Sequence, residues 1–97
     1  MKKISLCRLL ERAARNLADS EIAIMHLMDK FENGEITAAA ARRTFRGPRG
    51  LWNAFVIDAN RFNNLINAIY KIDAKAAQFN PVDLTEMGAK YFDYFVY

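Results

Sequence analysis

Apolar residues recur at helical spacing along two long stretches of the chain. In residues 3–33 the repeat positions, separated alternately by four and three residues, are Leu6, Leu10, Ala13, Leu17, Ser20, Ile24, Leu27 and Phe31. In residues 51–78 the same repeat runs through Trp52, Phe55, Ala59, Phe62, Ile66, Ile69, Asp73 and Ala76. This spacing keeps one face of an α-helix largely apolar over its whole length. It predicts two long helices of similar length that pack against each other as an antiparallel hairpin.

Turn and capping residues predict a short helix between the two long ones. Asn33-Gly34 tolerates the left-handed conformation that ends many helices, and Thr37 is suited to cap a helix at 37–46. Alanine fills four successive positions of this helix, which favours the helical state. The sequence Gly47-Pro48-Arg49-Gly50 then ends it in a sharp turn.

The C-terminal segment carries one more apolar helical face. Asn80 and Pro81 predict a helix at 81–95, with Asn80 as its cap and Pro81 at its first position. The predicted fold is therefore all-α and forms one domain, residues 1–97. It is a small helical bundle built on two long antiparallel heptad-patterned helices, a short connecting helix and a C-terminal aromatic helix.

The apolar stripe of residues 51–78 is wider than a two-stranded coiled-coil seam requires. Leu51, Leu65 and Tyr70 all lie beside the repeat positions. The surplus width predicts a further partner for this helix, and a homodimer is one interpretation. Asp73 is the charged residue on the seam, and antiparallel pairing predicts that it forms an ion pair with Arg8 or Arg12.

The composition indicates the kind of protein and its compartment, and says little about its function. The chain has 97 residues, 53% of them hydrophobic and 26% charged, which is typical of a globular protein. Cys7 is the single cysteine, so no internal disulfide can form, and we expect a cytoplasmic protein. No apolar run is long enough to span a membrane, so we expect no membrane partner. The net charge is +3, and the positive excess lies in residues 1–50.

The strongest candidate for a binding site is the cluster Arg42, Arg43, Arg46 and Arg49. Guanidinium groups bind phosphate and carboxylate through paired hydrogen bonds, and four of them follow one another within eight residues. A structural interpretation remains open, because arginine near a helix C-terminus also stabilises the helix dipole. The cluster predicts a partner-binding or phosphate-binding site.

A row of asparagines forms a second candidate. Asparagine is a poor helix former, yet a row of asparagines falls within the second long helix. They lie outside the apolar seam and predict a hydrogen-bonding contact surface, with a solvated face as the alternative: Asn53, Asn60, Asn64 and Asn67.

No catalytic or metal-binding signature appears in the sequence. One cysteine and one histidine, Cys7 and His26, cannot make a zinc set, and no phosphate-binding loop or nucleophile motif is present. We therefore expect neither an enzyme nor a cofactor. Trp52 opens the helix after the Gly47–Gly50 turn, where a DNA-reading helix would present polar residues, so sequence-specific DNA recognition is disfavoured.

Three functional hypotheses remain open at this point. The leading one is a small protein-interaction module that binds a protein partner and occludes it, for example a phage-type or mobile-element-type inhibitor of a host nucleic-acid-handling complex. The second is a nucleic-acid-binding protein without sequence preference, which would use the arginines on phosphates. The third is a structural module for oligomerisation.

Overall fold

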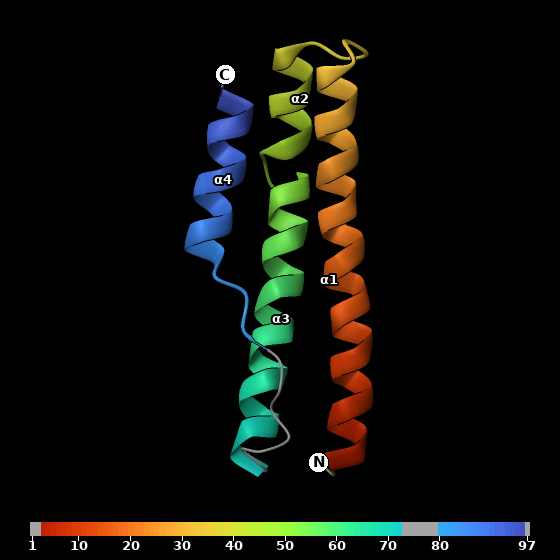
Figure 1. The fold of residues 1–97 in the computed structure, drawn as a ribbon, viewed down its shortest axis with the longest axis vertical. Coiled ribbons are helices and arrows are strands. Elements are labelled where there is room, and N and C mark those ends of the chain that lie inside the picture. The colour runs from red at the N-terminus through yellow and green to blue at the C-terminus, as the bar shows by residue number, and fades with distance from the viewer. Residues whose placement is uncertain (1–2, 73–79, 97) are drawn as a thin grey trace.

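The structure, a computed structural model, describes residues 3–72 and 80–96, which form four helices and no strand. These are α1 (Lys3–Glu32), α2 (Ala38–Phe45), α3 (Leu51–Ile72) and α4 (Leu84–Val96). Helix α1 runs antiparallel to a column made by α2 and α3, and α4 lies along the other side of that column (Figure 1). The molecule measures 48 × 22 × 20 Å. The predicted all-α bundle is confirmed, whereas the expected helix at 73–78 and the ion pair of Asp73 fall outside the described residues.

The connection from α1 to α2 follows the predicted capping signals. Gly34 has a φ of 73°, the left-handed conformation that glycine adopts without strain. The N–H groups of Gly34 and Glu35 donate to the carbonyl oxygens of Phe31 and Lys30, at 3.1 and 2.9 Å, and so close the end of α1. Thr37 then caps α2, because its hydroxyl oxygen accepts a hydrogen bond from the Ala40 N–H at 3.1 Å.

The start of α4 differs from the prediction. The helix begins at Leu84 instead of residue 81, and its cap is Asp83, not Asn80. The Asp83 carboxylate accepts from the N–H groups of Thr85 and Glu86 at 3.0 and 3.1 Å. A carboxylate suits this place because it also complements the positive end of the helix dipole.

A tertiary contact explains the delayed start of α4. The side-chain amide of Asn63 in α3 bonds to both backbone groups of Val82: it accepts from the N–H at 2.8 Å and donates to the carbonyl oxygen at 3.1 Å. Both backbone groups of Val82 are therefore committed to α3, and the helix can form only after this residue.

The core divides into two clusters along the α1–α3 pair. The lower cluster joins the beginning of α1 to the end of α3 through Leu6, Leu10, Ala13, Phe62, Ile66 and Ile69. The upper cluster joins the end of α1 to α2, α4 and the beginning of α3. This pairing confirms the antiparallel arrangement. Trp52, Leu17 and Phe31, which were also expected in this core, are partly buried.

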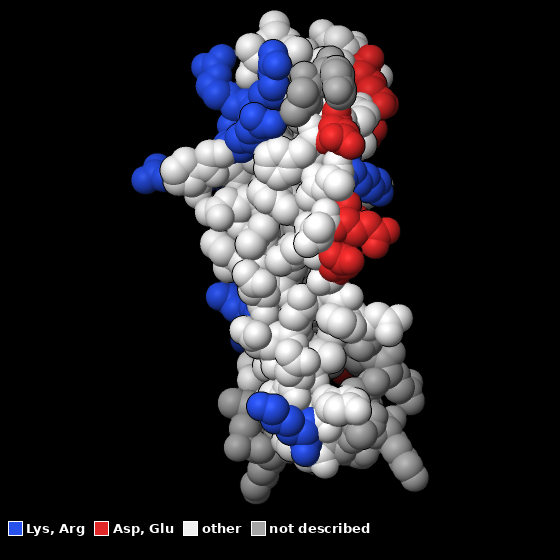
Figure 2. All heavy atoms as spheres, turned by 90° about the vertical axis from the view of Figure 1, so that its left-hand side faces the viewer, with Lys and Arg blue, Asp and Glu red and all other residues white. Residues whose placement is uncertain are grey.

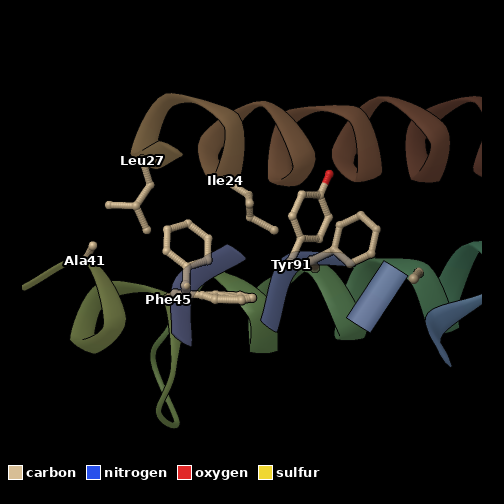
Figure 3. Packing of buried hydrophobic residues seen from close by; sticks show 8 residues of the cluster. Ile24, Leu27, Ala41, Phe45 and Tyr91 are labelled. Carbon is tan, nitrogen blue, oxygen red and sulfur yellow. The ribbon is translucent and has the colours of Figure 1, made fainter. Parts of the chain in front are cut away.

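Phe45, the last residue of α2, lies at the centre of the upper cluster with no exposed surface. Its ring lies between Leu27 and Ile24 of α1 and Tyr91 of α4 (Figure 3). The ring centroids of Phe95, Phe92 and Trp52 lie 4.5, 5.1 and 5.9 Å away. One residue thus connects all four helices and fixes the direction in which the chain leaves α2.

Candidate functional site

Four arginines gather where α2 ends and α3 begins. We name this set the arginine tip, and all four of its side chains are exposed: Arg42, Arg43, Arg46 and Arg49. Three of them, Arg43, Arg46 and Arg49, line one shallow depression at the Gly47–Gly50 turn. Arg42 lies one residue before Arg43, in the last turn of α2. The fold therefore brings residues from a helix and from a turn to one place.

Hydrogen bonds within the chain hold the turn that carries the arginine tip. The Gly50 N–H donates to the Gly47 carbonyl oxygen at 3.0 Å, and Asn53 Nδ2 donates to the Pro48 carbonyl oxygen at 2.8 Å. A Cβ at Gly50 would lie 2.4 Å from the Arg46 carbonyl oxygen, so glycine is required there by the chain's own backbone. The amide nitrogen of Asn53, expected at a contact surface, is used in this turn.

The charge of the arginine tip is not neutralised within the described part of the chain. No carboxylate described there forms an ion pair with any of its four guanidinium groups. The guanidinium carbon of Arg46 lies 5.0 Å from the centre of the Phe92 ring, a cation–π contact that orients this side chain. Most Lys and Arg atoms at the upper end of the molecule lie on one side, and the Asp and Glu atoms lie on the other side with a smaller basic group among them (Figure 2).

Two tyrosines of α4 hold carboxylates of α1 in place. The Tyr91 hydroxyl donates to Glu21 at 3.1 Å, and the Tyr94 hydroxyl donates to Glu32 at 2.6 Å. The pKa of Tyr91 and of Tyr94 is raised to about 12. Burial of each ring is the larger cause, and the hydrogen bond to its glutamate is the next. These contacts fasten α4 to the acidic side of the molecule.

A second concave surface runs between α1 and α3. We name it the α1–α3 groove; it has a volume of about 710 Å³. Its residues come from both helices: Leu9, Arg12, Ala13, Asn16, Ile57, Asn60, Arg61, Asn64 and Leu65. A neighbouring depression shares Asn64 with it and extends to Leu6, Asn67 and Ile72. The two together form a hollow along the lower half of the hairpin.

The structure separates the predicted asparagine row into parts. Asn60 and Asn64 line the α1–α3 groove, and Asn67 lines its continuation. Asn53 lies instead at the turn of the arginine tip, so the two sets of predicted residues meet only there. The candidate residues therefore belong to two surfaces, one at the start of α3 and one along the rest of this helix.

Several residues important to these surfaces were not identified from the sequence. Arg61 faces the groove from α3, and Asn63 anchors Val82. Ser20, an irregular member of the apolar repeat, donates a hydrogen bond to Asp58 across the α1–α3 interface. A polar residue on an apolar seam was the signal for Ser20, whereas nothing local distinguishes Asn63 from its asparagine neighbours.

The described residues offer binding surfaces and few groups for chemistry. Among them, no three His, Cys, Asp or Glu side chains come together as metal ligands. His26 is exposed and Cys7 is partly buried. No helix in the described ranges combines the length and the apolar character needed to cross a membrane.

Comparison of the chain with protein-family models, with curated proteins and with solved structures yields no match.

Proposed function

We propose that this chain is a small protein-interaction module whose arginine tip binds an acidic surface of a partner protein and occludes it. The observation that carries the proposal is the set of four exposed guanidinium groups that no described carboxylate neutralises. Their backbone is held by hydrogen bonds before any partner arrives, which lowers the entropy cost of binding. Arginine is also the residue best suited to paired hydrogen bonds with carboxylates.

The charge pattern around the tip favours an acidic protein surface over a nucleic acid. Nucleic-acid backbones carry closely spaced phosphates along their length, and a protein that binds them tightly contacts several phosphates at once. Here the basic residues form a compact patch, and acidic side chains occupy the other side of the same end (Figure 2). Exposed carboxylates at this end include Asp29, Glu32 and Glu35. These would repel a phosphate backbone that continued past the tip.

The test replaces the four tip arginines with alanine in the full chain. Tagged parent and variant are used to capture partners from a lysate of the organism that encodes the chain, and the bound proteins are compared. We expect the variant to lose the partner that the parent captures, while far-UV circular dichroism shows unchanged helicity. The matched control removes four positive charges elsewhere, by changing Lys2, Lys3, Lys30 and Lys90 to alanine, and should keep the partner.

Two outcomes would contradict this proposal. If the tip variant captures the same partner as the parent, the arginines are a solvated turn. If the parent binds duplex DNA with an affinity that falls steeply between about 50 and about 200 mM salt, and the tip variant does not, phosphate is the ligand.

A further inference from the structure

The two sides of the α1–α3 hairpin differ in how much of the chain covers them. On one side, Asn63 holds the backbone of Val82, and α4 is fastened to α1 further up. Leu65 lies two residues beyond Asn63, about 200° around the helix, and lines the α1–α3 groove. In this groove Ile57 keeps 51% and Leu9 36% of its surface exposed. The side away from Val82 therefore presents apolar side chains to solvent.

The walls of the groove carry positive charge. Arg12 of α1 and Arg61 of α3 both line it, and its described lining contains no carboxylate. Arg8 and Arg15 lie one turn before and after Arg12 on the same edge of α1. The carboxylate of Asp58, next to Ile57 in the chain, accepts a hydrogen bond from the Ser20 hydroxyl and does not line the groove. An apolar floor between basic walls is complementary to an apolar stripe flanked by acidic residues.

The dimensions of the hollow suit a helix. The groove and its continuation follow α3 from Ile57 to Ile72, which is about 22 Å, or four helical turns. A groove between two antiparallel helices accepts side chains from a third helix, and a helix satisfies its own backbone hydrogen bonds. A bound helix would thus need only side-chain contacts from the groove.

We propose that the α1–α3 groove binds an amphipathic helix of a partner protein, with an apolar stripe flanked by Glu or Asp. This surface is separate from the arginine tip and goes beyond the function proposed for it. A second copy of this chain fits the groove less well. Two-fold packing of groove on groove would bring Arg12 and Arg61 of one copy against the same residues of the other, and like charges repel.

The test selects helices against the immobilised full chain. The probe is a displayed library of helical peptides of about 16 residues, with leucines at fixed three- and four-residue spacing and Glu, Lys or Ser allowed at the flanking positions. We expect Glu to be enriched over Lys at those positions by about tenfold or more. Selection against the double variant Arg12→Glu/Arg61→Glu should reverse the preference, so that Lys is enriched.

Matched variants connect the selected helix to the groove. With the selected peptide labelled for fluorescence anisotropy, Ile57→Glu should weaken binding by about tenfold or more. Ile22→Glu is the control, because Ile22 is 47% exposed and lies outside the lining of the groove. Circular dichroism checks that both variants keep the helicity of the parent. The alanine variant of the arginine tip should bind this peptide as the parent does, so the two proposals can fail separately.

The proposal is overturned if no peptide is enriched, if Glu and Lys are enriched equally, or if Ile57→Glu and Ile22→Glu weaken binding alike. It is also overturned if the chain forms a dimer that Ile57→Glu dissociates, since a second copy would then occupy the groove.

Discussion

At the scale of single residues, Phe45 shows how much of the packing one position controls. It ends α2, has no exposed surface and contacts aromatic rings from α3 and α4. Edge-to-face and tilted ring pairs stabilise a core beyond the area that they bury. Because Phe45 is also next to Arg46, the same residue sets the direction of the arginine tip.

We expect Phe45→Ala to lower the free energy of unfolding by about 3–5 kcal/mol, since it removes a fully buried ring and leaves a cavity among rigid neighbours. Urea denaturation followed by circular dichroism measures this loss. Ile22→Ala, at an exposed position of α1, should cost less than about 1 kcal/mol and serves as the control. A loss below about 1 kcal/mol for Phe45→Ala would show that the upper cluster repacks easily.

At the scale of elements, the attachment of α4 rests on groups that titrate at high pH. Tyr91 and Tyr94 donate to Glu21 and Glu32, and the folded state raises the pKa of both tyrosines from 10.0 to about 12. A raised pKa in the fold means that the neutral hydroxyl is the form that the fold stabilises. The contribution of these two hydroxyl groups to the free energy of unfolding is therefore complete below pH 10, and it is lost as the pH rises toward 12.

We therefore expect the free energy of unfolding to fall as the pH rises from 10 toward 12. Urea denaturation at successive pH values measures the slope. The double variant Tyr91→Phe/Tyr94→Phe removes both hydroxyl groups, so it should start less stable and show a shallower fall over the same range. An equal slope in parent and variant would mean that other groups govern the alkaline loss.

The helices also show which features of the fold could be predicted from residues close together in the sequence. The repeat of residues 51–78 predicts α3 because each position adds to one apolar face, and Gly34 and Thr37 mark real helix ends. The start of α4 was missed because Asn80-Pro81 was preferred to Asp83 and Glu86, the local capping pattern at the observed start. The Asn63–Val82 bonds, which join residues 19 positions apart, could not be predicted by a local rule. Of the two candidate sites, the arginine tip could be predicted because its four arginines lie close together in the sequence. The role of Arg61 could not, because it depends on which side of α3 stays uncovered.

At the scale of the whole molecule, the width of the α3 stripe has an explanation within one chain. Part of that width packs against the C-terminal segment: the Trp52 ring lies 5.5 Å from the Phe92 ring, a Cβ on Gly88 would meet the Trp52 ring at 3.4 Å, and Val82 packs against both core clusters. Of the exposed apolar residues of α3, Ile57 lines the α1–α3 groove, whose walls carry like charges, and Ile72 lines its continuation, whereas Tyr70 lines neither. The homodimer stays a prediction, and the like charges of Arg12 and Arg61 disfavour a second copy in the groove.

We accordingly expect sedimentation velocity at micromolar concentration to show a species of 11.1 kDa with the friction of an elongated particle. Raising the salt concentration should leave this species unchanged if the groove does not receive a second copy. A dimer that appears when salt screens the arginines would restore the interpretation in which a second copy covers α3.

The division of the second column into α2 and α3 also constrains how this fold can vary. Within the described residues, α1 packs against both α2 and α3, which follow one another in the second column. An insertion of one heptad in α1 would leave two turns of apolar stripe without a facing neighbour unless α3 lengthened by the same amount. In related sequences, we therefore expect an insertion or deletion in α1 to be accompanied by one of equal length in α3. Single-residue insertions belong in the Asn33–Thr37 connection, where they rotate no helix face.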